Sequence, residues 1–121
     1  MRYTRIEHDG NGGSRTVDVD VPLKAQPFAA NVPPLMVGSP IAATGVVFVE
    51  FPEAVRDTEP HPTPQRQFGV ILSGIAETRT SDGQVRRYSA GSVVLLDDTK
   101  GAGHTTSVLE PPFRIMFVPL P

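Results

Sequence analysis

The sequence contains no cysteine, and this absence excludes disulfide scaffolds, thiolate metal sites and cysteine nucleophiles together. It also lacks an excess of basic residues: the net charge is −2, which provides no electrostatic footprint for nucleic acid. No apolar run approaches the roughly 20 residues of a membrane span, and the N-terminal stretch has no apolar core of signal-peptide length. These absences predict a cytoplasmic protein that binds neither nucleic acid nor membranes.

Helical signals and common catalytic signatures are missing as well. No window joins a 3.6-residue period to an N-cap and a later glycine stop. The glycine-rich stretch at residues 101–103 is not followed by the Lys-Ser/Thr pair of a phosphate-binding loop, and no Ser-His-Asp elbow is visible. The sequence therefore predicts neither a helical framework nor a phosphate-binding loop.

Proline and glycine are abundant instead. The 13 prolines and 11 glycines make about a fifth of the 121 residues, well above the usual share. A hydrophobic content of 39% is still sufficient for a packed core, so this composition indicates short strands joined by turns. A chain of this length predicts one domain, residues 1–121.

Alternating apolar runs between turn signals predict about nine strands. Residues 9–13 and 81–84 have the composition of hairpin turns, and residues 52–64, with four prolines, are expected to form a loop. Residues 22–40 hold five prolines and no clear period, so we expect an extended segment that wraps the body. The predicted strands span residues 3–8, 14–21, 41–51, 65–72, 75–80, 85–88, 92–96, 105–109 and 113–118.

This pattern predicts an all-β sandwich or small barrel. The longest apolar stretch, residues 41–51, is expected to be buried on much of both faces. Substantial burial is predicted for seven apolar side chains: Val46, Phe48, Ile71, Val94, Leu96, Ile115 and Phe117.

One face of the strand that precedes Gly74 is small and partly polar. Gln67, Gly69, Ile71 and Ser73 share this face, because successive side chains of a strand point to opposite sides. We expect it to line the interior near the mouth of the barrel. Gly69 leaves room there for a ligand, or it marks a bulge or a close approach of the backbone, and the pattern does not choose between these interpretations.

Two blocks of sequence couple a histidine to an alternating apolar run. The first, HPTPQRQFGVILSGIAE, spans residues 61–77, and the second, AGSVVLLDDTKGAGH, spans residues 90–104. Over about residues 61–109 they resemble the two motifs of the cupins, which are double-stranded β-helix or jelly-roll barrels. Anchored on Gly74, the histidine positions of the first motif fall on His61 and Thr63, and the glutamate position falls on Gln67. The second motif runs from Gly91 to His104, with a longer loop that lacks the usual proline.

The resemblance implies a jelly-roll barrel, a homodimer and a divalent transition metal (Fe, Mn, Zn or Ni) held by His61, Gln67 and His104. The unpaired edges of a small β-sandwich also favour a dimer, with the N-terminal strands packed on a neighbour. Two imidazoles and a neutral amide leave the charge of a metal ion uncompensated unless Asp97, Asp98 or water joins the ligands. A metal-free pocket with two histidines is the competing interpretation.

Each candidate residue also has a structural interpretation. His61 lies in a proline-rich segment, where histidines are commonly exposed, whereas the glycines at 101 and 103 give the backbone freedom to bring His104 inward. Asp97 and Asp98 would join the site or cap the turn that follows them. Glu50 would be a general acid or base if its strand directs it inward.

Two functions are compatible with these residues. The first is an enzyme that binds a small organic molecule in the barrel and uses metal-assisted or histidine acid/base chemistry, of dioxygenase, isomerase or lyase type. His104 and Glu50 would be its catalytic residues. The alternative is a non-catalytic module that binds or senses a small ligand without a metal.

Overall fold

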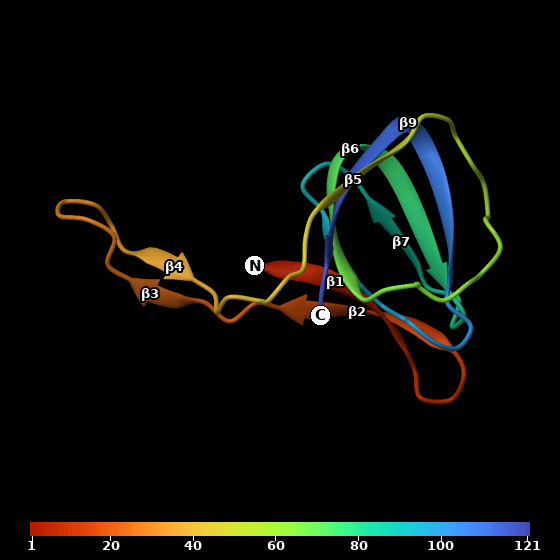
Figure 1. Ribbon diagram of the computed structural model, residues 1–121, viewed down its shortest axis with the longest axis horizontal. Coiled ribbons are helices and arrows are strands. Elements are labelled where there is room, and N and C mark those ends of the chain that lie inside the picture. The colour runs from red at the N-terminus through yellow and green to blue at the C-terminus, as the bar shows by residue number, and fades with distance from the viewer.

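The computed structural model describes all 121 residues and consists of strands and loops (Figure 1). It contains no helix, and therefore none long and apolar enough to cross a membrane. The predicted all-β class is confirmed. The strands are β1 Arg2–His8, β2 Ser14–Asp20, β3 Lys24–Gln26, β4 Leu35–Val37, β5 Val47–Phe51, β6 Gln67–Thr80, β7 Val85–Tyr88, β8 Val93–Asp97 and β9 His104–Pro119.

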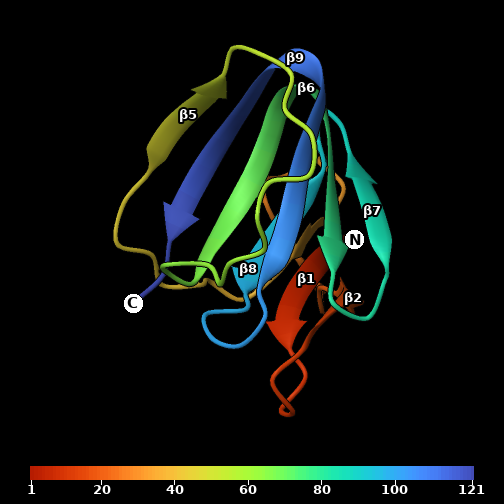
Figure 2. The same cartoon turned by 90° about the vertical axis from the view of Figure 1, so that its right-hand side faces the viewer.

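Seven of these strands form one mixed sheet in the order β2-β1-β8-β6-β9-β5, with β7 paired to β6 (Figures 1 and 2). The β1–β8 pair is parallel and the other pairs are antiparallel. Strands β2 and β5 lie at the two ends of this order and do not pair with each other, so the sheet is not closed into a barrel. The jelly-roll closure expected from the sequence is not observed.

The two longest strands bend the sheet. Strands β6 and β9 pair along most of their length, with register shifts between Ile71 and Ala76. At the bend Gly74 has φ +82°, and a Cβ there would come within 2.5 Å of the Glu110 carbonyl oxygen. Only glycine combines this conformation with so close an approach. The runs 65–72 and 75–80, predicted as two strands, are therefore one bent strand, and the runs 105–109 and 113–118 are likewise both part of β9.

Side chains connect β2 to the end of β6, although these two strands share no backbone ladder. Ser14 of β2 and Ser81, directly after β6, exchange hydrogen bonds between backbone N–H and hydroxyl oxygen at 2.7 and 2.9 Å. Next to them the hydroxyls of Thr16 and Thr80 are 3.2 Å apart. The bent end of β6 is thus held near the β2 edge without a shared ladder.

Both predicted hairpin turns are present. Asp9 accepts hydrogen bonds from the N–H groups of Asn11 and Gly13, which hold the pKa of its carboxyl below the ordinary value. Its own N–H donates to the Gly13 carbonyl at 3.0 Å. At the other turn the N–H of Thr80 donates to the carbonyl of Gln84.

The core lies on the concave face of the bent sheet. Three of the seven side chains predicted to be buried, Ile71, Val94 and Ile115, belong to it, and Leu96 and Phe117 pack against it partly buried. The prediction was wrong for Val46 and Phe48, which are 53% and 72% exposed. The core cluster comprises Ile6, Ile71, Ala76, Tyr88, Val94, Val108, Phe113 and Ile115.

The expected burial of residues 41–51 and the wrapping role of residues 22–40 were both wrong. Residues 41–46 form no strand, and β5 is an edge strand that pairs only with β9. The preceding segment forms the β3–β4 hairpin, which stands away from the sheet as an arm (Figure 1). The residue pattern identified extended structure in residues 22–51, but it does not show whether such a segment packs against the sheet.

Candidate functional site

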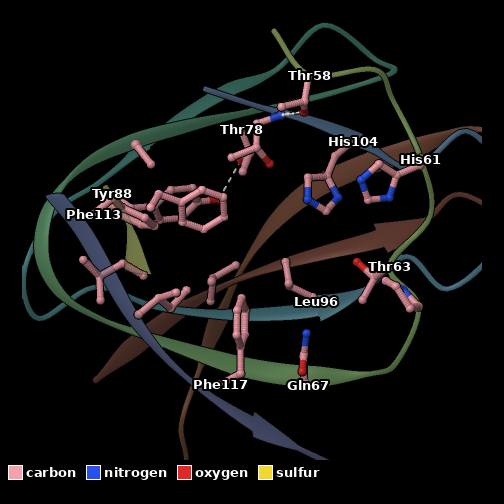
Figure 3. Close-up of a pocket in the computed structure, with 17 residues that line it drawn as sticks. Thr58, His61, Thr63, Gln67, Thr78, Tyr88, Leu96, His104, Phe113 and Phe117 are labelled. Carbon is pink, nitrogen blue, oxygen red and sulfur yellow. Dashed lines mark hydrogen bonds between the residues drawn. The ribbon is translucent and has the colours of Figure 1, made fainter. Parts of the chain in front are cut away.

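A cavity of about 250 Å³ lies against the concave face (Figure 3). Both halves of β6 and β9 line it, together with β5, β7, β8 and the segment that joins β5 to β6. That segment runs antiparallel to β9, with bridges from Val55 to Val108 and from His61 to His104. Prolines at 60, 62 and 64 have no N–H to donate, so the segment follows β9 without becoming a regular strand.

One side of the cavity is polar and the remainder is apolar. Threonine, glutamine and histidine side chains from the loop and the strand ends form the polar side, whereas apolar side chains of the core form the rest (Figure 3). No Asp, Glu, Lys or Arg side chain lines the cavity, so its wall suits an uncharged molecule. The principal apolar residues are Phe51, Ile71, Leu96, Phe113, Ile115 and Phe117.

Glycine geometry brings the two histidines together at the polar side. Gly101 and Gly103 have φ values of +82° and +69°, and a Cβ on Gly103 would overlap the backbone of His61 and Pro62. This close approach allows His61 and His104 to pair through both N–H groups, at 3.3 and 3.4 Å. Paired residues of an antiparallel bridge carry their side chains on the same side. Both imidazoles accordingly line the cavity (Figure 3).

His104 is held by a buried carboxylate. Its Nδ1 lies 2.6 Å from Oδ2 of Asp98, whose side chain is fully buried, while His104 itself is 9% exposed. The hydroxyl of Thr63 donates to Oδ1 of Asp98 at 2.7 Å, and the Thr63 N–H donates to the Asp98 carbonyl at 3.0 Å. Because a carboxylate accepts and does not donate, Nδ1 carries a proton, and in the neutral ring Nε2 keeps its lone pair.

Nε2 of His104 and the amide of Gln67 remain free toward the cavity. Neither makes a hydrogen bond to another residue that lines it (Figure 3). Gln67 is the first residue of β6 and lies on its concave face, as the alternation of the strand predicts. A lone pair and an uncommitted amide therefore face the same space, and a ligand there can be bound by both.

His61 has a different environment from His104. Its side chain is exposed, and its Nδ1 lies 3.0 Å from the carbonyl oxygen of Pro62. No carboxylate holds its ring, so it lacks the fixed orientation that Asp98 gives His104. His61 is suited to cover the mouth of the cavity and to contact a ligand, but not to set the direction of a proton transfer.

A second polar pair lies deeper in the cavity wall. The Tyr88 hydroxyl is 2.8 Å from the Thr78 hydroxyl, and both residues are buried (Figure 3). Burial raises the pKa of the Tyr88 phenol above its ordinary value of 10, and the hydrogen bond with Thr78 opposes this only in part. The phenol therefore stays neutral and can donate a hydrogen bond.

No protein-family model matches the chain, and no curated protein matches it in sequence. The interpretation of the cavity rests on its residues alone.

Two candidate residues from the sequence do not reach the cavity. Glu50 lies on the exposed side of β5, where its carboxylate accepts a hydrogen bond from Arg114 at 2.8 Å, so the inward orientation that an acid or base role would require is not present. Asp97 points the other way from its neighbour Asp98 and pairs with Arg66 at 2.9 Å. Alternation along the strand explains why the side chains of these two adjacent aspartates point to opposite sides of the sheet.

The predicted metal ligands do not form a set that fits a divalent ion. His61 and His104 would each supply one imidazole and Gln67 a neutral amide, whereas the Asp98 carboxylate is directed at Nδ1 of His104 and at Thr63. No group of three or more His, Asp and Glu side chains gathers as metal ligands would. These residues offer neither a third imidazole nor a carboxylate to compensate the charge of the ion, so they fit a resident transition metal poorly.

Asp98 and Thr63 are the site residues whose roles sequence reasoning missed. Asp98 was expected to join a metal or to cap a turn, and Thr63 was only assigned to a histidine position of the first motif. The available signal was parity: Asp98 follows Leu96 by two residues, so it continues the inward side of β8. A carboxylate on that side requires a buried partner.

Proposed function

We propose that the cavity binds a small, uncharged and largely apolar organic molecule, and that His104 acts on it as a general acid or base. The observation that carries this proposal is the 2.6 Å contact between Asp98 and His104 behind an imidazole that lines the cavity. Imidazole exchanges a proton near neutral pH, and Nε2 is the atom that faces a ligand. Asp98 is a positioning residue, since it touches His104 and not the ligand.

The wall of the cavity defines the class of substrate. A carboxylate or phosphate would find no Lys or Arg there, whereas a neutral ring or short chain can be covered by the aromatic and aliphatic side chains. Gln67 can donate a hydrogen bond to a carbonyl oxygen at the polar side. A neutral ketone, aldehyde or lactone with a hydrogen on the adjacent carbon combines these requirements.

The chemistry that follows is a proton transfer. Nε2 takes the proton from the carbon next to the carbonyl, and the electron pair moves to form an enolate whose oxygen accepts a hydrogen bond from the Gln67 amide. In a substrate with a carbon–carbon double bond beyond that carbon, the imidazolium returns the proton to the far end of the resulting dienolate, which gives the conjugated isomer. In a substrate with a hydroxyl on the β carbon, the imidazolium protonates the departing oxygen as the C–O bond breaks and a C=C bond forms, which gives an elimination. Isomerase and lyase reactions need only this step, whereas a dioxygenase also requires the metal that the residues do not fit.

The fold and the location are part of the same proposal. The open sheet is a cupin-like variant, supported by His61, Thr63, Gln67 and His104 lying around one cavity. A cytoplasmic location without nucleic-acid or membrane partners remains a prediction. A non-catalytic module that binds the same ligand class is the second candidate, favoured by the exposure of His61 at the mouth.

Hydrogen exchange of a bound ketone tests the catalytic role directly. Cyclohexanone in D₂O should exchange the hydrogens next to its carbonyl faster with the protein than with buffer, as followed by NMR. His104→Ala should remove the acceleration, and His61→Ala should retain most of it. Binding of cyclohexanone with no acceleration by the unmodified protein would favour the non-catalytic module.

Charge and metal supply two controls. Cyclohexanecarboxylate has the same ring with a negative charge, and it should bind at least about tenfold more weakly, because the wall holds no cation. Dialysis against EDTA should leave the exchange rate unchanged. A rate that falls after dialysis and returns with Zn²⁺ or Mn²⁺ would contradict the metal-free mechanism and restore the metal site predicted from the cupin resemblance.

A further inference from the structure

The apolar surface of this protein is concentrated in one stretch of chain. Nine of its twelve large, exposed hydrophobic side chains fall between residues 28 and 48, and no charged residue occurs between Lys24 and Glu50. The stretch comprises the β3–β4 arm and its connection to β5. The nine residues are Phe28, Val32, Leu35, Met36, Val37, Ile41, Val46, Val47 and Phe48.

The arm lacks the cover that a hairpin of this kind requires. All six residues of β3 and β4 are exposed, and the two strands pair only with each other. An isolated two-stranded hairpin is at best marginally stable in water. The consecutive residues Leu35, Met36 and Val37 are all apolar and all exposed, so both faces of β4 present apolar side chains to solvent.

The start of β5 also presents consecutive apolar side chains to solvent. Val46, Val47 and Phe48 are consecutive, apolar and exposed, although a surface strand normally alternates between apolar and polar residues. Strand β5 pairs with β9 on one side only, so its other edge offers unpaired N–H and C=O groups. Two exposed apolar surfaces, one on the arm and one on the sheet edge, are therefore present in the same chain.

We propose that these two surfaces bind each other in a homodimer, in which the arm of each copy packs along β5 of the other. The contact is self-complementary, because Met36 of one copy meets Phe48 of the partner and the reverse contact forms at the symmetry-related position. A dimer was expected from the sequence through the N-terminal strands, and this proposal assigns it to the arm and β5.

The exposed area is of the size that a dimer needs. Aromatic side chains bury 150–250 Å² each, so Phe28 and Phe48, at 67% and 72% exposure, offer roughly 200–350 Å² together. A standard interface takes about 800 Å² from each partner, and seven further aliphatic side chains contribute to it. A membrane surface is the less suitable partner, because segments that bind membranes place several Lys and Arg beside their apolar residues and this one has Lys24 alone.

Light scattering of the whole protein at micromolar concentration tests the dimer. The expected mass is twice the 13.0 kDa of the chain, and Met36→Glu and Val47→Glu should each halve it. Val85→Glu is the matched control, since Val85 on β7 is 48% exposed and Val47 is 50% exposed, and it should stay dimeric. A monomeric unmodified protein, or a dimeric Met36→Glu variant with an unchanged circular dichroism spectrum, would overturn the proposal.

A second experiment identifies what the arm touches. The chain has no cysteine, so Met36→Cys and Phe48→Cys chains, one of them labelled with ¹⁵N, can be mixed and oxidised. Mass spectrometry should find disulfides that join one labelled and one unlabelled chain. Links between two Met36→Cys arms alone would contradict the contact with β5. Sedimentation of the protein with phosphatidylcholine vesicles, lost in Met36→Glu, would favour the membrane instead.

Discussion

Asp98 and His104 form a buried pair in which both carboxylate oxygens are engaged by side chains from other parts of the chain. Oδ2 lies 2.6 Å from Nδ1 of His104, and Oδ1 accepts a hydrogen bond from Thr63 at 2.7 Å. The carboxylate lies behind the imidazole and does not line the cavity. It fixes the orientation and the tautomer of the ring while Nε2 stays free.

Asp98→Asn should preserve the shape of the site and damage its chemistry. An amide that donates to Nδ1 would shift the imidazole proton to Nε2, which then cannot accept a proton from the ligand. We expect the ketone exchange rate to fall about 100-fold or more, the range of general acid–base contributions, with little change in ketone affinity. Exchange that continues at the original rate in this variant would show that His104 does not act as the base.

Asp98→Ala should destabilise the fold far more than Asp97→Ala. Removing the buried carboxylate leaves Nδ1 of His104 and the Thr63 hydroxyl without partners, at about 1–3 kcal/mol for each buried group. Asp97 forms partly exposed ion pairs with Arg66 at 2.9 Å and with Arg5 at 3.7 Å, and the loss of each costs about 0–1 kcal/mol. Urea denaturation of the two variants measures the difference. Equal losses for these neighbouring residues would contradict the burial described here.

The sequence predicted the local features of the fold well, because they depend on residues close together in the chain. The hairpin turns at residues 9–13 and 81–84 follow from Asp, Asn and Gly, and the concave placement of Gln67 follows from strand alternation. At Gly69 the neighbouring atoms are those of side chains and not of backbone: a Cβ there would lie 2.8 Å from Cδ1 of Ile115, a contact that the pattern did not predict.

The errors concern relations between distant segments, which local pattern does not determine. Val46 and Phe48 look like core residues because periodicity reports apolar character and not the surface that covers it. Glu50 faces outward because pairing with β9 sets the register of β5. The residue pattern of 41–51 alone does not determine this pairing. The Asp98–His104 contact depends on a loop that Gly103 brings against His61.

Tyr88→Phe should reveal how burial of the phenol makes the free energy of unfolding depend on pH. Because the folded pKa is raised above 10, the neutral phenol stabilises the fold fully below pH 10, and this contribution is lost as the pH rises through the folded pKa. Below pH 10 the variant should be less stable by about 1 kcal/mol, the usual value of one hydrogen bond, here the one to Thr78. The difference in urea midpoints between the two proteins should narrow as the pH rises. A difference independent of pH would show that the phenol is not buried.

Gly103→Ala should disrupt the approach of the two histidines. A Cβ at residue 103 overlaps the backbone of His61 and Pro62, and the residue also has a positive φ of +69°. Gly83→Ala is the matched control, because Gly83 has φ +87° with no atom within 4 Å of the added Cβ, so it measures the conformational cost alone. We expect a loss in the free energy of unfolding of about 1 kcal/mol for the control and of at least about 3 kcal/mol for Gly103→Ala, since backbone cannot move aside as a side chain can.

The amide NMR signals of His61 and His104 provide a second measurement of this approach. They should shift in Gly103→Ala and stay in place in Gly83→Ala. Similar stability losses in both variants, with both signals unchanged, would mean that the segment at His61 is not seated on β9 as described.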